Sequence, residues 1–164
     1  AYEILTCDWS SDVCSSDRAV SGLDLDVAAV VASAGPDDIV WVGWRVASVA
    51  RTDWACVQHA EPVTEPRTAT PGELIVMARI AGRRVERIRT YSPGCPIDTS
   101  GRPVVWLDGV TGAASVAWLG AQATAPDTPG VTPDERKRLR TGAMDALSLH
   151  RDPAALAFLT QVLK

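Results

Sequence analysis

Apolar and polar residues alternate most clearly in the middle of the chain, where the pattern predicts a β-hairpin. Between residues 73 and 80 every second side chain is apolar and shares one strand face: Leu74, Val76, Ala78 and Ile80. A turn at 81–83 leads to a return strand at 85–91. Val85 and Ile88 are three residues apart there, so we expect a β-bulge near Glu86 and Arg87 to keep both on the inner face.

Two further segments are predicted to join this hairpin in a small antiparallel sheet. Residues 39–46, IVWVGWRV, are rich in β-branched and aromatic side chains. Trp41 points to one face of this strand, and the other face carries apolar residues at alternate positions: Val40, Val42, Trp44 and Val46. Residues 103–107 form another short strand, and the Pro/Thr/Glu-rich residues 59–72 form a long loop.

Helical spacing and capping residues predict helices on both sides of the sheet segments. Residues 23–34 form a short helix that Asp24 or Asp26 can cap. Thr111 can cap a helix that runs to about residue 122. The Pro/Thr/Gly-rich residues 123–131 then form a linker, which is the best candidate for a domain boundary.

The C-terminal residues 132–164 are predicted to form a helical hairpin. Thr132, Pro133 and Glu135 make a capping box with proline at the first helical position. A second helix begins after Arg151, with Asp152 as its cap and Pro153 as its first residue. That helix has a broad apolar face, made of Leu156, Leu159 and Leu163 with Phe158 and Val162. The pattern as a whole predicts an α+β fold, with a sheet and packed helix in 18–122 followed by this hairpin.

Composition narrows the classes of function. The net charge of −4 argues against a general nucleic-acid surface. No apolar run approaches the roughly 20 residues of a membrane-spanning helix. The 46% of hydrophobic residues is an ordinary globular value, so a core can form.

The first 17 residues are not expected to contribute to the fold. Residues 8–17, DWSSDVCSSD, match the translation of a common short-read sequencing adapter. We therefore expect residues 1–17 to be non-native and Cys7 and Cys14 to be spurious, with the native start and any signal peptide not visible. Cys56 and Cys95 then remain, and their pairing is open between a disulfide that closes a large loop and two free buried thiols.

The search for catalytic or metal-binding patterns gives only weak candidates. Cys56 and His59 lie three residues apart, without the second pair of ligands that a structural zinc site needs. Asp98 and Asp108 lie in turn sequences, where aspartate usually hydrogen-bonds local backbone. A nucleophile elbow, a phosphate-binding glycine loop and a metalloprotease helix motif are all missing from the sequence. We therefore predict no enzyme activity, no cofactor and no metal.

Two groups of side chains have both a binding and a structural interpretation. Five tryptophans could line a ligand groove, but core packing is the more usual role: Trp41, Trp44, Trp54, Trp106 and Trp118. Four arginines cluster near the hairpin turn, where a solvated or protected sheet edge is favoured over an anion site: Arg83, Arg84, Arg87 and Arg89.

The run VERIRTYSPGCPIDTSGRPVVWLDGVTGAASVAWL, followed by ALSLHRDPAALAFLTQVLK, resembles a family of bacterial, exported HEAT-repeat proteins. The matching features are the hairpin, the Ser92–Cys95 loop, the WLDGV strand end at 106–110 and the helix that follows. The strand VWVGWRV at 40–46 is also similar to that family, so the resemblance extends over most of residues 39–164. It carries no catalytic residues to transfer.

The resemblance implies a small α+β front domain followed by helical repeats that bind another protein. It favours the Cys56–Cys95 disulfide and a periplasmic or extracellular location. HEAT units bury their faces by stacking on one another, so we expect the sequence to be a fragment of a longer array. The resemblance then implies an exposed interaction face at Leu156, Leu159 and Leu163. The leading hypothesis is therefore a non-enzymatic protein-interaction scaffold. The alternatives are a small-ligand module that uses the Trp-rich sheet and an unrecognised hydrolase that uses Asp98, Asp108 or His59.

Overall fold

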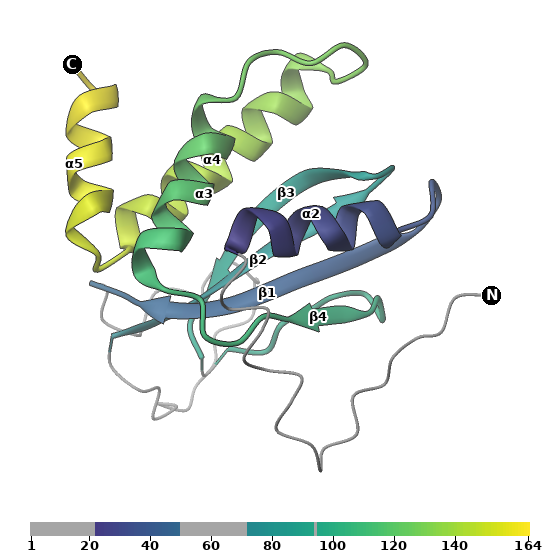
Figure 1. The fold of residues 1–164 in the computed structure, drawn as a ribbon, viewed down its shortest axis with the longest axis horizontal. Helices are drawn as coiled ribbons and strands as arrows, with labels where there is room; N and C mark the ends of the chain where they lie inside the picture. Colours follow the sequence, from purple (N-terminus) through teal and green to yellow (C-terminus); the bar gives the residue numbers. More distant parts are fainter. Residues whose placement is uncertain (1–21, 50–71, 94) are drawn as a thin grey trace.

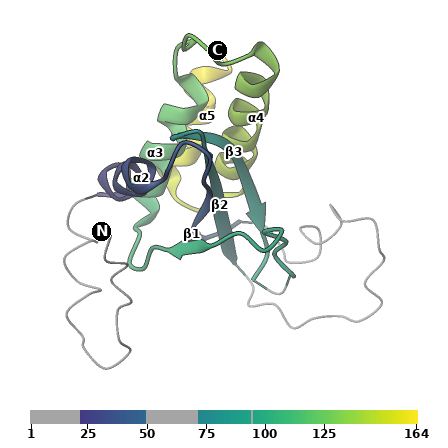
Figure 2. The ribbon, with the colours of Figure 1, turned by 90° about the vertical axis from the view of Figure 1, so that its right-hand side faces the viewer.

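A computed structural model of the chain describes residues 22–49, 72–93 and 95–164. These residues form a four-stranded sheet whose one face is covered by helices (Figures 1 and 2). The α+β class and the C-terminal helical hairpin are confirmed. The predicted segment 1–17, together with Cys56, His59 and Trp54, lies outside the described residues.

The sheet has the strand order β3-β2-β1-β4. β1 (Ile39–Ala47) pairs with β2 (Glu73–Ala81), and β2 pairs with β3 (Arg84–Tyr91), both in the antiparallel sense. β4 (Val104–Trp106) pairs with β1 in the parallel sense, so the prediction of a purely antiparallel sheet was wrong in this detail. The reason is that β3 and β4 lie at opposite edges of the sheet, so the chain between them makes a crossover and not a hairpin.

The predicted bulge in the hairpin is confirmed. Arg79 pairs with Arg87 while Ile80 pairs with Val85, which leaves Glu86 as the extra residue of β3. The turn itself consists of Gly82 and Arg83, which both have φ near +58° (57° and 58°). Positive φ at both central positions is the signature of a type I′ turn, whose twist matches that of the flanking strands.

Three of the four helix caps were predicted correctly. Thr111 accepts the backbone N–H of Ala114 at the start of α3 (Gly112–Thr124). Thr132 and Glu135 form the capping box of α4 (Pro133–Leu149), and Asp152 caps α5 (Pro153–Val162). The prediction of a side-chain cap for α2 (Leu23–Ser33) was wrong, because its N-cap is Gly22 and both aspartates lie in its first turn. There they still interact favourably with the positive end of the helix dipole.

The main core lies between the helices and the sheet face that the alternation predicted. Trp44 is its centre, fully buried, with its ring edge-on to Trp118 at a centroid distance of 5.3 Å. The indole N–H of Trp44 donates to the hydroxyl of Ser115 at 3.0 Å. Trp41 lies on the opposite sheet face, as predicted, in a second small cluster with Ile75 and Met77.

A single core continues across the predicted linker 123–131. Leu119 of α3 and Leu139 and Leu147 of α4 belong to the same buried cluster as the sheet residues. Within the linker, the carbonyl of Ala125 accepts a hydrogen bond from Arg140 at 2.8 Å. In the part of the chain that the structure describes, α4 therefore packs into the α+β core and does not form a separate one.

Backbone hydrogen bonds join the junction between α4 and α5 to the end of β1. Ser48 and His150 form an isolated antiparallel bridge. The N–H of Val49 donates to the carbonyl of Leu149 at 2.9 Å, and the N–H of Arg151 donates to the carbonyl of Ala47 at 3.0 Å. These bonds fix where α5 begins and so set its position beside α3.

Candidate functional site

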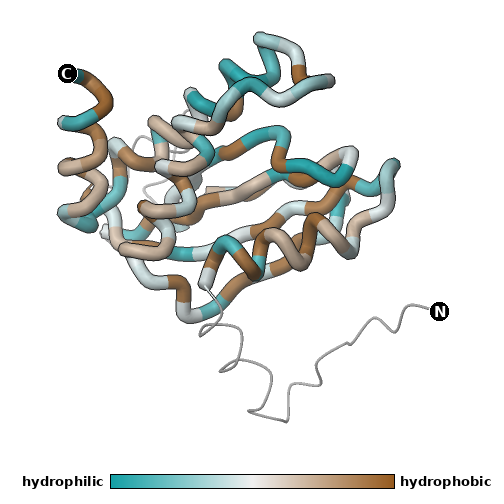
Figure 3. Tube along the Cα trace, turned by 45° about the horizontal axis from the view of Figure 1, so that its top comes forward, coloured by the Kyte–Doolittle hydropathy of each residue, from teal (hydrophilic) through white to brown (hydrophobic). Residues whose placement is uncertain are grey.

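The apolar face predicted on α5 is divided by the structure into an inner and an outer side. Leu156 and Leu163 are 71% and 77% exposed, and Val162 is 45% exposed. Leu159, by contrast, is half-buried and packs against the core. Figure 3 shows brown segments recurring along α5 as far as its last turn, with pale and teal segments between them. The exposed part of the predicted face is therefore Leu156 and Leu163, which are seven residues apart and lie on one side of the helix.

The inner side of α5 is held close to α3. Ala155 is buried, and the ring of Phe158 lies over Gly120, where an added Cβ would come within 2.9 Å of the ring. α5 is thus apolar both toward the core and toward solvent. A helix that is apolar on opposite sides is typical of one buried between two layers.

Cys95 is buried and is a disulfide-bonded cysteine in the structure. Cys56, like Cys7 and Cys14, lies outside the described residues. The pairing of Cys56 with Cys95 therefore stays a prediction.

The carboxylates considered for hydrolysis lie in surface turns. The Oδ1 atom of Asp98 accepts the backbone N–H of Ser100 at 2.7 Å, which is the local turn role expected from the sequence. Asp108 is exposed in the turn after β4. His59, the third candidate, lies outside the described residues.

The described tryptophans favour the packing interpretation over a shared ligand groove. Trp44 and Trp118 are in the main core, and Trp41 is buried on the other face of the sheet. Trp106 is 45% exposed, and its ring lies across Gly43, where a Cβ would meet it at 2.7 Å. The core position of Trp44 and Trp118 keeps both rings away from any ligand at the surface.

The arginines near the hairpin differ in whether they form an ion pair with a carboxylate. Arg84 forms an ion pair with Glu135 at 3.2 Å, and Arg79 pairs with Glu86. Arg87 and Arg89 make no ion pair with a described carboxylate; instead they line a hollow together with Lys137 and Arg138 of α4. We call this hollow the cationic groove.

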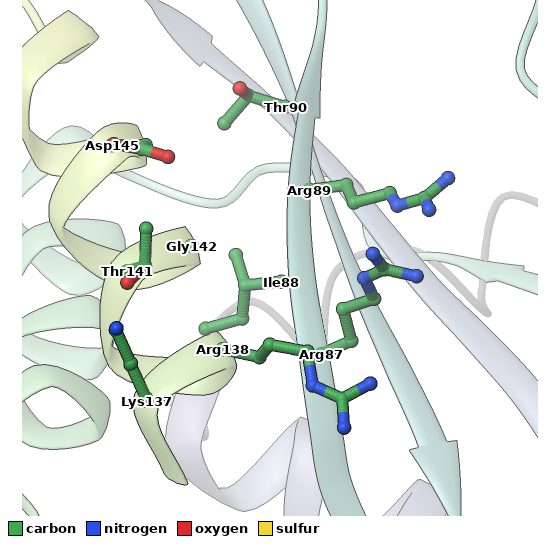
Figure 4. A pocket seen from close by; sticks show the side chains of 9 residues that line it. All are labelled: Arg87, Ile88, Arg89, Thr90, Lys137, Arg138, Thr141, Gly142 and Asp145. Atoms are coloured by element: carbon green, nitrogen blue, oxygen red, sulfur yellow. The ribbon is translucent and has the colours of Figure 1, made fainter. Parts of the chain in front are cut away.

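The cationic groove lies between β3 and α4 and has a volume of about 440 Å³ (Figure 4). Its lining comes from four consecutive residues of β3 and from one side of α4: Arg87, Ile88, Arg89 and Thr90, and Lys137, Arg138, Thr141, Gly142 and Asp145. In Figure 4 the side chain of Arg138 reaches across from the helix toward Arg87. Asp145 is the one acid among the lining residues, and it lies at the far end of the groove from Arg138.

The charges in the groove act on one another. Partial burial lowers the pKa of the Arg87 guanidinium, and the neighbouring positive charges of Arg89 and Arg138 lower it further. Arg89 donates to the Tyr91 hydroxyl at 3.5 Å, and Arg138 donates to the Asp134 carbonyl at 3.4 Å, both at the long end of the hydrogen-bond range. The groove is therefore a concentration of positive charge in a chain whose net charge is negative.

The sequence drew attention to Arg87 and Arg89 of β3, although a solvated sheet edge was favoured over an anion site, and it gave no indication of the helix half of this groove. Lys137, Thr141 and Asp145 are spaced by four residues, so the sequence does place them on one side of a helix. It does not say that this side of α4 lies beside β3. Gly142, in the interior of a strong helix pattern, was the available signal for a close backbone approach at this point.

A second hollow, of about 620 Å³, surrounds the α4–α5 junction. His150 is 4% exposed there, and its Nδ1 atom accepts the backbone N–H of Asp152 at 3.3 Å. Its Nε2 atom is buried and finds no hydrogen-bond partner in the described part of the chain. Charged side chains line the hollow around it: Arg45, Glu73, Arg151 and Asp152.

Mildly acidic pH is expected to destabilise the fold through His150. Burial lowers the pKa of His150 below the usual histidine value of 6.5, and the charge of Asp152 opposes that shift. The unfolded chain then binds a proton at His150 more readily than the folded protein does. The free energy of unfolding is therefore unaffected by this group above pH 6.5, and it falls as the pH drops through 6.5 toward the lower folded-state pKa. Denaturant unfolding between about pH 7.5 and about pH 5, above the range of ordinary carboxylates, measures the fall.

The variant His150→Gln is the matched test for this pH dependence, because glutamine does not titrate. We expect its free energy of unfolding to change less over the same pH range. An equal fall in His150→Gln and the unsubstituted protein would assign the effect to other groups.

The described residues contain no helix that is both long enough and apolar enough to cross a membrane. They also contain no group of three or more histidine, cysteine or carboxylate side chains placed to hold a metal ion. Comparison of the chain with protein-family models, with curated proteins and with solved structures finds no match.

Proposed function

We propose that this chain is a non-enzymatic protein-interaction scaffold that binds an amphipathic helix of a partner protein on the outer side of α5. The observation that carries the proposal is the exposure of Leu156 and Leu163 on a helix whose inner side is already packed. The resemblance to bacterial HEAT-repeat proteins supports it, since helices in such arrays are sandwiched between neighbours. The same resemblance supports an exported, extracytoplasmic location.

The expected occupant follows from the chemistry of the surface. The outer side of α5 offers two leucines seven residues apart, Leu156 and Leu163, and Thr160 is the polar residue between them. Each leucine buried by a partner contributes about 1.5–3 kcal/mol relative to its exposed state. A second helix that lays its own apolar stripe along α5 would bury these side chains without burying unpaired polar groups.

The double substitution Leu156→Glu/Leu163→Glu is expected to abolish association through α5. Without its partner, the apolar face should drive reversible self-association, which sedimentation equilibrium detects over a concentration series. The substituted protein should stay monomeric and keep its unfolding midpoint, because both side chains are exposed. The matched control is Leu25→Glu, a leucine on α2 that is 60% exposed and distant in sequence from this face.

Two results would contradict the proposal. The unsubstituted protein could remain monomeric at every concentration, or the Leu25→Glu control could lower association as much as the α5 substitutions. Either result would leave the outer side of α5 as an ordinary apolar surface.

A further inference from the structure

The cationic groove opens at the free edge of the sheet. Successive side chains of a strand point to opposite faces, so a hollow lined by the four consecutive residues 87–90 must touch the edge of β3 and not only one face. Within the described residues β3 has one strand neighbour, β2, on its other side. The groove is therefore accessible from solvent, with the backbone of β3 as its floor and α4 as its wall.

Its positive charges are not neutralised within the described protein. Arginines elsewhere on the same two elements have carboxylate partners: Arg84 with Glu135, and Arg136 and Arg140 with Asp127. The four cations of the groove have no such pair among the described residues: Arg87, Arg89, Lys137 and Arg138. Among them, Arg87, Arg89 and Arg138 lie close enough for their positive charges to repel one another, and an anion between Arg87 and Arg138 would reduce that repulsion.

We propose that the cationic groove binds a small polyanion that carries phosphate or carboxylate groups, with its charged oxygens held between Arg87 and Arg138. This site is separate from the outer side of α5 and does not depend on the scaffold proposal. Guanidinium groups present their N–H donors in a planar fork that matches the oxygens of both anions. The volume of about 440 Å³ lies within the range of small-molecule sites.

The arrangement also sets the orientation of the ligand. Asp145 lies at the end away from Arg138, where it would repel an anionic group. Next to it are neutral groups, the hydroxyl of Thr141 and the mostly buried Thr90. The ligand should therefore carry its negative charge at one end and a neutral or positive group at the other.

Isothermal titration calorimetry with tripolyphosphate and with citrate tests the proposal on the full chain. We expect saturable binding that weakens as the salt concentration rises. Arg138→Gln, on the exposed side of α4, should weaken binding roughly tenfold or more while leaving the unfolding midpoint unchanged. Arg87→Gln should weaken it by a similar factor. The matched control is Arg102→Gln, an exposed arginine outside the groove, which should bind as the unsubstituted protein does.

Each outcome of the titrations either supports or overturns the proposal. Tighter binding of tripolyphosphate identifies a phosphate ligand, and tighter binding of citrate identifies a carboxylate ligand; either supports the site if Arg138→Gln weakens it. Undetectable binding of both anions overturns the proposal. So does an equal loss in Arg102→Gln and Arg138→Gln, which would mean that the anions bind to the general surface.

Discussion

Replacing Gly142 by alanine is expected to lower the free energy of unfolding by about 2–4 kcal/mol. A Cβ at this position would lie 2.3 Å from the carbonyl oxygen of Ile88 and 3.2 Å from the Ile88 Cβ. The obstacle is backbone of β3, which cannot rotate aside as the end of a side chain can. α4 would have to move away from the sheet edge, and the contacts of Ala143, Ala146 and Leu147 with the core would loosen.

Gly120→Ala in α3 is the matched control for this prediction. Both substitutions gain about 1 kcal/mol of helix propensity, because alanine replaces glycine in a helix interior. The Cβ at position 120 meets the edge of the Phe158 ring at 2.9 Å, and that side chain on α5 can shift. Urea unfolding should therefore show a clearly larger loss for Gly142→Ala. A Gly142→Ala variant as stable as the original would mean that α4 does not lie this close to β3.

The features that the sequence predicted correctly depend on residues that are neighbours in the chain. The alternation at 73–80 assigned the inner face of β2, and the three-residue spacing of Val85 and Ile88 located the bulge that the structure has at Glu86. The capping box at Thr132 was equally recognisable, because its two hydrogen bonds join residues three positions apart. In each case the physical cause is contained in a few consecutive residues.

The features that were missed depend on long-range packing. Nothing local in 103–107 says that this strand runs parallel to β1, because its direction is set by a crossover of the preceding segment. Nothing local in α4 says which of its sides contacts β3, so Lys137 and Arg138 were not joined to Arg87. Leu159 was assigned to the exposed face because the resemblance implies an unstacked repeat, and in the structure it is half-buried against the core, as Phe158 is.

Replacing Trp44 by alanine is expected to lower the free energy of unfolding by about 3–5 kcal/mol. Trp44 is fully buried and packs edge-on against Trp118, so truncation removes a large apolar area and leaves a cavity at the junction of β1 and α3. Denaturant unfolding followed by circular dichroism measures the loss. A loss below about 1 kcal/mol, the size of an ordinary surface substitution, would contradict the central position of this side chain in the core.

The hydrogen bond from Trp44 to Ser115 makes a second, sharper test possible at the same site. Ser115→Ala leaves the indole N–H buried without an acceptor, and we expect a loss of about 1–3 kcal/mol. In a Trp44→Phe background the donor is already absent, so the same serine substitution should cost much less. A double-mutant cycle measures that difference as a coupling energy. A coupling energy near zero would mean that the two groups do not bond, and that α3 is held on the sheet by apolar packing alone.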